Sequence, residues 1–324
     1  MSLVEWITTA VALTSGTGEM LDITNTNYKL TSTVEILVTS EKGDRLASRD
    51  NVDFTFGQAE GVVINVKPEI IKQTLHGIGT SFTESSAYVL AHLSKDKRQR
   101  VMNKIYGEQG ANFSIARTVI GATDFSVEGG FSYDDVKEDK QLLHFSITPD
   151  IDGFSEKEYP GIKDNAFDVL PMIKQALAIK EQQNDSELKI IASAWTAPSW
   201  MKDIEDWHQP GSKENDYQGT GGVLKQGYEK YYANYLVKYL DHYNNHGINI
   251  WGLTPVNEPL GNNGQWESMH FSAESQNDFI KYHLGPALHR SGNVDVKLLM
   301  FDHNRGCLLY TSPSPRDCVS NRVC

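Results

Sequence analysis

From about residue 74 the chain alternates between short apolar runs and amphipathic stretches, and this alternation limits the folds open to it. The apolar runs cover residues 75–83, 113–120, 188–195, 250–256 and 296–301. Helices are predicted between them, among others at residues 274–290 and most clearly at residues 228–243, where tyrosine and leucine repeat with the helical period. A long polar loop is expected at about residues 121–161. Strands that alternate with helices form parallel sheets through right-handed crossovers. A (β/α)8 TIM barrel needs eight such units. The sequence therefore predicts an incomplete α/β barrel of about five strands over residues 74–305.

Residues 1–73 have a different pattern. Residues 28–38, 52–56 and 62–66 are rich in residues that favour strands, and glycines stand between them. We expect an N-terminal β-rich segment.

The last stretch, residues 306–324, also differs from the rest. It holds all three cysteines, and Pro313 and Pro315 prevent the helix that should follow the fifth strand. We interpret residues 306–324 as a non-native tail, similar to translated vector or adapter sequence.

Composition excludes several classes of function. The chain has 42 acidic and 30 basic side chains, a net charge of −12, which argues against binding to nucleic acid. The ten histidines and three cysteines show no metal-ligand spacing, so we expect no metal and no cofactor. No apolar stretch is long enough to span a membrane. Residues 1–16 lack a basic n-region, and no clear signal peptide is predicted.

The strand predicted at residues 250–256 delivers Asn257 and Glu258 at its C-terminal end, where Pro259 stops it. The C-terminal ends of strands are where (β/α)8 barrels hold catalytic groups. Glycosidases need two carboxyl groups, one to protonate the leaving oxygen and one to attack the anomeric carbon or activate water. Glu258 is one candidate, and Asn257 could hydrogen-bond the sugar 2-OH. The alternatives are a solvated glutamate and a strand-end cap.

Further candidates lie on the other predicted strands. Trp195 ends the third strand and is expected to offer its ring as a platform for the apolar face of a sugar. Arg117 lies within the second strand and either orients Glu258 or forms a structural ion pair. Glu84 follows the first strand and either supports the site through hydrogen bonds or serves as a charge at a helix N-terminus. Asp302, after the fifth strand, is expected only at the rim of the pocket or as a support for the loop.

Five segments together resemble glycoside hydrolase family 30, and within it the glucosylceramidase branch. They are His76-Gly-Ile-Gly-Thr-Ser-Phe-Thr-Glu84, Ala116-Arg-Thr-Val-Ile-Gly-Ala-Thr-Asp-Phe-Ser126, Ala192-Ser-Ala-Trp-Thr-Ala-Pro-Ser-Trp-Met201, Val256-Asn-Glu-Pro259 and Leu298-Leu-Met-Phe-Asp302. The resemblance implies a TIM barrel with a small β-sandwich domain, to which residues 1–73 would contribute strands. It also implies a lysosomal or secreted protein.

The resemblance assigns roles to the residues that match. It implies Glu258 as the acid/base of a retaining β-glucosidase, Asp124 as an acceptor from glucose hydroxyls, and Phe125 as part of the pocket wall. The nucleophile it implies is a second glutamate at the end of the seventh strand, a position that would lie past Cys324. We therefore expect the 324-residue chain to be inactive by itself.

The substrate implied is glucosylceramide, hydrolysed to glucose and ceramide, with peripheral contact to a lipid surface. A β-1,6-glucanase or β-xylosidase of the same family is an alternative, because the acid/base motif serves all of them. A non-catalytic carbohydrate-binding protein is another.

Overall fold

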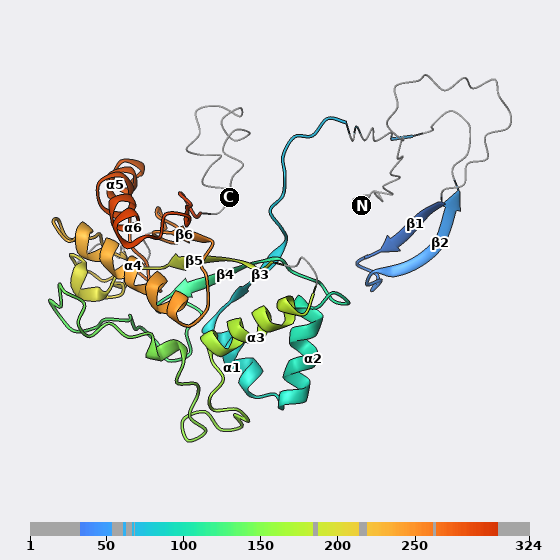
Figure 1. Cartoon of the computed structure of the whole chain (residues 1–324), viewed down its shortest axis with the longest axis horizontal. Helices are drawn as coiled ribbons and strands as arrows, with labels where there is room; N and C mark the ends of the chain where they lie inside the picture. The colour runs from blue at the N-terminus through green and yellow to red at the C-terminus, as the bar shows by residue number, and fades with distance from the viewer. Residues whose placement is uncertain are drawn as a thin grey trace. The chain divides into compact units, whose positions relative to one another are not determined.

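The computed structural model describes residues 33–53, 61–62, 67, 69–183, 187–213, 219–261 and 264–303. The chain divides into two compact units, Met1–Leu75 and His76–Cys324 (Figure 1).

The first unit contains an antiparallel hairpin. Strand β1 (Thr33–Val38) pairs with β2 (Ala47–Asp53), and a left-handed glycine, Gly43, lies in the connection. The side chains of β1 alternate between exposed and half-buried, as expected for a strand with one covered face. Strand β2 begins earlier than the predicted strand at 52–56. Residues 28–32, 54–56 and 63–66 of the predicted strands lie outside the described part of the chain.

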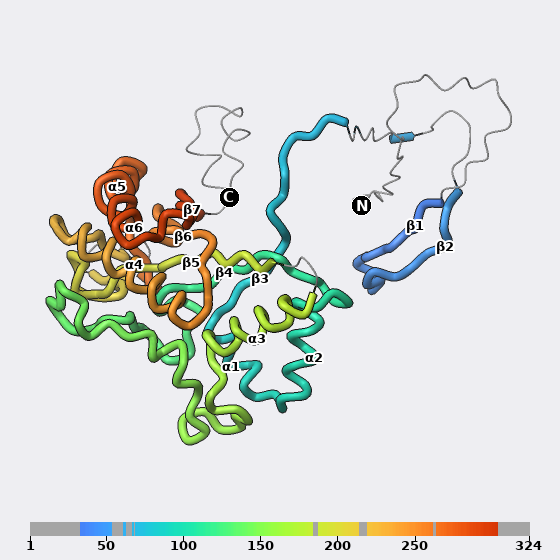
Figure 2. Tube along the Cα trace, viewed as in Figure 1, coloured from blue at the N-terminus to red at the C-terminus, as the bar shows by residue number. Residues whose placement is uncertain are grey.

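The second unit alternates strands and helices and confirms the predicted partial barrel. Its elements are β3 (Gly79–Phe82), α1 (Glu84–Ala91), α2 (Lys95–Tyr106), β4 (Ile115–Ile120), α3 (Val169–Glu181), β5 (Lys189–Ala194), α4 (Glu229–Asn245), β6 (Gly252–Thr254), α5 (Ala273–Phe279), α6 (Gly285–Ser291) and β7 (Lys297–Leu298). The five strands form one parallel sheet in the order of the sequence (Figure 2). Sequential parallel strands joined by helical crossovers are the arrangement of a TIM barrel.

The two faces of this sheet differ in burial. Ala116, Ile190 and Ala192 point to one face and are at most 2% exposed. Ile115 and Ile191, on the other face, are only half-buried. In a (β/α)8 barrel the helices cover the outer face, so the half-buried face corresponds to the barrel interior. Arg117 shares that interior face with Ile115, because side chains on a strand alternate.

A cluster of tyrosines packs the long β4–α3 connection against α4. Tyr235, Tyr239 and Tyr243 of α4 are buried, and Tyr133 of the connection stacks on Tyr235 and Tyr239 with ring centroids 6.2 and 5.7 Å apart. Asp150, 3% exposed, accepts hydrogen bonds from the hydroxyls of Tyr133 (2.7 Å) and Tyr243 (2.6 Å). Much of the stretch expected as a polar loop is therefore a packed layer.

The helix predicted at 274–290 is interrupted. A π-helical turn, Ile280–Leu284, separates α5 from α6. The physical reason is Pro286, which has no N–H to donate to the carbonyl four residues earlier, so the regular ladder cannot continue through it.

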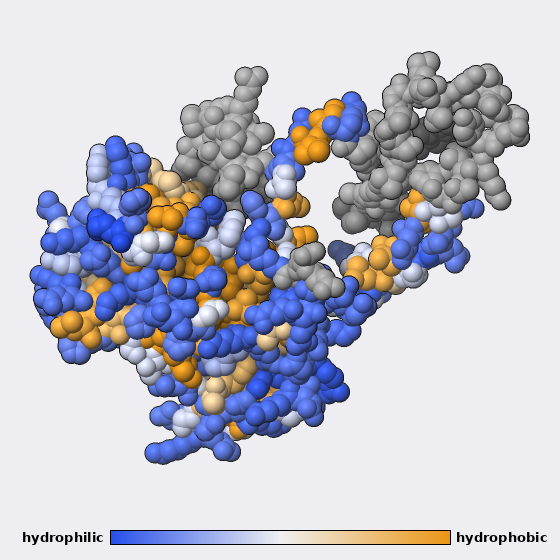
Figure 3. All heavy atoms as spheres, in the orientation of Figure 1, coloured by the Kyte–Doolittle hydropathy of each residue, from blue (hydrophilic) through white to orange (hydrophobic). Residues whose placement is uncertain are grey.

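The face of the molecule in Figure 3 is largely hydrophilic over the second unit, with apolar residues showing between the charged ones. Within the described ranges, no helix combines the length and the apolar character needed to cross a membrane.

Candidate active site

The ends of β5, β6 and β7 bring Asn257, Glu258 and Asp302 together. The N–H of Asn257 donates to the carbonyl of Ala194 at the end of β5 (2.6 Å), and the N–H of Glu258 donates to the carbonyl of Asp302 (2.7 Å). Asn257 and Asp302 form a parallel bridge that continues the sheet beyond β6 and β7. These residues therefore occupy the C-terminal edge of the sheet, where a barrel places its chemistry.

The backbone of Glu258 is in the left-handed region, with φ of 47°. A residue with a side chain adopts this conformation at a cost, and it persists only where neighbouring groups hold it. The carbonyl of Glu258 accepts from the N–H of Gly261 at 2.6 Å, which closes a tight turn. A Cβ atom at position 261 would lie 3.2 Å from the Cβ of Glu258 and 3.3 Å from its Oε2. Glycine at 261 thus leaves room for the Glu258 side chain.

Arg117 links four strands at this edge. Its Nη2 lies 2.6 Å from Oδ2 of Asp302, 2.8 Å from Oδ1 of Asn257 and 2.9 Å from Oγ of Ser193. The Ser193 hydroxyl also donates to Oδ2 of Asp302 (2.8 Å). Because the amide oxygen of Asn257 faces the guanidinium, its amide nitrogen faces away and can donate to a ligand.

The network supports one of the roles considered for Arg117 and gives Asp302 more contacts than expected. Of the two roles considered for Arg117, the ion pair is present, and its partner is Asp302, with both side chains just over a quarter exposed. Asp302 was expected only as rim or loop support, yet it accepts from Arg117 and Ser193. Its backbone carbonyl also holds Glu258. The reason is that the sheet continues past β7, which brings residue 302 level with residue 257.

Trp195 does not lie as a sugar platform should. It is 5% exposed, and the Arg117 guanidinium lies over its ring at 4.5 Å. Its indole N–H donates to Oδ1 of Asp124 (3.0 Å). The ring is thus a support for Arg117 and Asp124, and little of it remains for stacking on a ligand. Phe125, in the loop after β4, is half-exposed and accessible to a ligand.

Glu84 combines the two roles that were considered for it. It is the first residue of α1, after the N-cap Thr83, and it is 5% exposed. Its Oε2 accepts from the N–H of Val127 at 2.6 Å, which ties α1 to the loop that carries Asp124 and Phe125. Burial raises the pKa of the Glu84 carboxyl.

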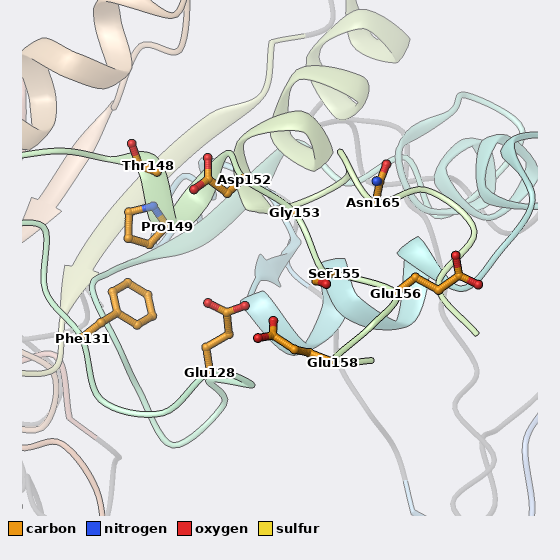
Figure 4. Close-up of a pocket in the computed structure, with 10 residues that line it drawn as sticks. All are labelled: Glu128, Phe131, Thr148, Pro149, Asp152, Gly153, Ser155, Glu156, Glu158 and Asn165. Carbon is orange, nitrogen blue, oxygen red and sulfur yellow. The ribbon is translucent and has the colours of Figure 1, made fainter. Parts of the chain in front are cut away.

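A separate cavity of about 560 Å³ lies in the β4–α3 connection (Figure 4). Its walls include Glu128, Asp152, Glu156 and Glu158, and it contains none of the predicted site residues. Burial and the neighbouring carboxylates of Glu158 and Asp152 raise the pKa of Glu128. In the part of the chain that the structure describes, no group of histidine, cysteine and acidic residues is arranged to hold a metal ion. The strand ends therefore remain the candidate site.

Sequence reasoning missed Ser193 and Gly261 as members of the site. Ser193 stands two positions before Trp195 on the same predicted strand, so the alternation of side chains could have placed both on one face. Gly261 gave no usable signal, because its function depends on the unusual backbone of Glu258.

The sequence matches the Glycosyl hydrolase family 30 TIM-barrel domain over residues 75–314. The chain belongs to this family. It is 31% identical over 248 residues to the lysosomal acid glucosylceramidase of Mus musculus, a match that covers 76% of the chain and 43% of the mouse protein. It is 32% identical to an endo-1,6-beta-D-glucanase of Aspergillus fumigatus, covering 72% of the chain and 44% of that enzyme.

Solved structures agree with this assignment. SrfJ from Salmonella typhimurium superposes with a TM-score of 0.69 at 27% identity, covering 85% of the chain and 55% of SrfJ. The chain spans about half the length of these relatives.

Proposed function

We propose that the whole protein is a retaining β-glucosidase in which Glu258 is the acid/base. The observation that carries the proposal is the position of Glu258 at the C-terminal edge of a family 30 barrel sheet, beside an amide whose orientation Arg117 fixes. Asn257 would donate its amide N–H to the sugar 2-OH, a bond that strengthens in the transition state of glycoside hydrolysis. Asp124, held by Trp195, would accept from sugar hydroxyls, and Phe125 would shape the pocket wall.

The reaction would take two steps. In the first, Glu258 gives its proton to the glycosidic oxygen while a second carboxylate attacks the anomeric carbon, so the bond to the aglycone breaks and a glycosyl-enzyme forms. In the second, Glu258 removes a proton from water, which releases the sugar with its original configuration. Asp302 is a poor candidate for the attacking carboxylate, because Arg117 and Ser193 both occupy its Oδ2.

Glucosylceramide is the substrate that we favour, with release of glucose and ceramide at a lipid surface. Support comes from the relative named a glucosylceramidase and from the exposed apolar side chains of Phe125, in the loop after β4, and Leu260, two residues after Glu258. A β-1,6-glucan is the second candidate, because a relative of equal similarity is named an endo-1,6-beta-D-glucanase.

The stereochemistry can be tested in a chimera that joins this chain, through His303, to the second half of the mouse lysosomal acid glucosylceramidase. Proton NMR of the first-formed sugar is expected to show the β-anomer from a β-glucoside, because two inversions at carbon restore the configuration. An initial α-anomer would contradict the retaining mechanism. Parallel assays with glucosylceramide and a β-1,6-glucan decide between the two substrates.

The 324-residue chain alone is expected to show no Glu258-dependent turnover, because the proposed mechanism needs a second carboxylate that we assign to a later strand. The measurement compares release of an aryl β-glucoside by the chain and by its Glu258→Gln variant. Equal background rates are the expected result. Turnover that depends on Glu258 in the chain alone would show that the nucleophile had been misplaced.

A further inference from the structure

We infer that Gln276 of α5 is a positioning residue for Glu258, an inference that rests on the proposed role of Glu258 as acid/base. The side chain of Gln276 is buried. It acts through two residues at the end of β7, Phe301 and Asp302.

The pairing between β6 and β7 is interrupted just before the site. Leu253 pairs with Leu298, and Asn257 pairs with Asp302 in the same register. Between these two pairings the chain leaves the ladder, and Phe301 takes a left-handed backbone with φ of 56°. A residue in this conformation cannot direct its N–H along a regular parallel ladder. The N–H of Phe301 therefore needs another acceptor.

Gln276 supplies that acceptor. Its Oε1 receives the N–H of Phe301 at 3.2 Å, from a side chain that is 3% exposed. The next residue, Asp302, offers its carbonyl to the N–H of Glu258 at 2.7 Å and its carboxylate to Arg117 at 2.6 Å. The side chain of Gln276 thus stabilises the backbone at Phe301. This backbone positions Asp302, which bonds both Glu258 and Arg117.

The other end of the same amide supports this reading. Within the described ranges, Nε2 of Gln276 is buried and has no hydrogen-bond partner. An unpartnered buried donor is unfavourable, and an apolar side chain of the same shape would avoid it. Among the described residues the oxygen of this amide makes a hydrogen bond, and that bond goes to Phe301, the residue before Asp302.

The hydrogen bond from the Glu258 N–H to the Asp302 carbonyl therefore lies between two residues with left-handed backbone. One is its donor, Glu258, and the other is Phe301, which precedes its acceptor. Backbone strain of this kind persists only where the surroundings over-determine it. Loss of the Gln276 bond frees Phe301 to return to an extended conformation. That change would move the Asp302 carbonyl away from Glu258 and alter the direction of the Glu258 side chain.

The test uses Gln276→Met, which keeps the length of the side chain and removes the acceptor, in the full 324-residue chain. Amide hydrogen exchange at Phe301 and Glu258 is expected to accelerate by about tenfold, the order expected for losing one hydrogen bond, while amides of β4 and β5 keep their rates. Gln276→Glu retains an oxygen at the Oε1 position and is expected to restore slow exchange. Gln175→Met on α3, whose amide bonds Gln99, is the matched control and should leave both amides unchanged.

Activity provides the second readout, in the chimera described above. Gln276→Met should lower kcat for a poor leaving group more than for a dinitrophenyl glucoside, with little change in KM, because it misdirects the proton donor. If the chimera shows no Glu258-dependent turnover, the proposed function fails. The hydrogen-exchange rates of Phe301 and Glu258 still test whether Gln276 positions Glu258. Unchanged exchange at Glu258, or acceleration spread evenly over the sheet, would overturn the inference.

Discussion

Glu258→Gln is expected to lower kcat/KM for an unactivated alkyl β-glucoside by roughly 10²–10⁴, the range that a positioned general acid contributes. The enzyme for this measurement is the chimera that supplies the later strands. Glutamine has nearly the same shape and can occupy the turn that Gly261 and Asp302 hold, but it has no proton to give. Dinitrophenolate is a good leaving group that departs without protonation. The first step with a dinitrophenyl glucoside should therefore be much less affected by the substitution. A larger loss of kcat/KM for the poor leaving group than for the good one is the evidence that Glu258 acts as the acid/base residue.

The matched control is Glu84→Gln. Glu84 is likewise a glutamate that follows a strand of the same sheet, but it is buried and its carboxylate accepts from the backbone N–H of Val127. We expect its replacement to affect both substrates to a similar degree, because it alters the loop of Asp124 and leaves proton transfer in place. If Glu258→Gln lowered both rates equally, Glu258 would be a binding or structural residue.

The fold could be predicted largely because its signals are local. The strand at residues 188–195 is mostly apolar and stands between two amphipathic helical stretches, and the same alternation of strand and helix continues to β7. The prediction of one continuous helix at 274–290 was wrong. The effect of Pro286 on the helical hydrogen bonds depends on how the neighbouring turns adjust, which the sequence does not show. The packed layer around Tyr133 and Asp150 could not be predicted, since it joins residues about a hundred positions apart.

The site was less predictable than the fold, for a physical reason. Which residues end strands follows from the pattern, so Glu258 and Asn257 could be proposed from sequence, while the role of Asp124 was implied by the family resemblance. The orientation of a side chain at the end of a strand does not follow from the sequence pattern. Trp195 ends its strand as expected, yet its ring packs under Arg117 instead of facing a ligand. The left-handed backbone of Glu258 likewise depends on contacts with Asp302, which is distant in sequence.

The free energy of unfolding is expected to fall as the pH rises from about 4 to about 7, because of two buried carboxyl groups in the β4–α3 connection. Burial raises the pKa of Asp150 to about 7, against the lowering effect of the hydrogen bonds from Tyr243 and Tyr133. Burial also raises the pKa of Asp168 to about 7, and the nearby carboxyls of Asp150 and Glu84 add to this. A raised pKa means that the fold favours the protonated form. The stabilisation is therefore complete below the unfolded pKa near 4 and is lost as the pH passes through the folded value.

For Asp150 alone the difference of about three pKa units corresponds to on the order of 4 kcal/mol between the two ends of this range. Thermal or urea unfolding of the chain between pH 4 and 8 measures it. Asp150→Asn, which stays neutral and keeps an acceptor for a tyrosine hydroxyl, should flatten the dependence and make the variant more stable than the parent at pH 8. Asp152→Asn, an exposed position in the same connection, should leave the slope unchanged. A slope that persists in Asp150→Asn would place its origin elsewhere. Stability that rises with pH would mean that Asp150 stays ionised in its tyrosine cluster, held by the two hydroxyls more strongly than burial opposes it.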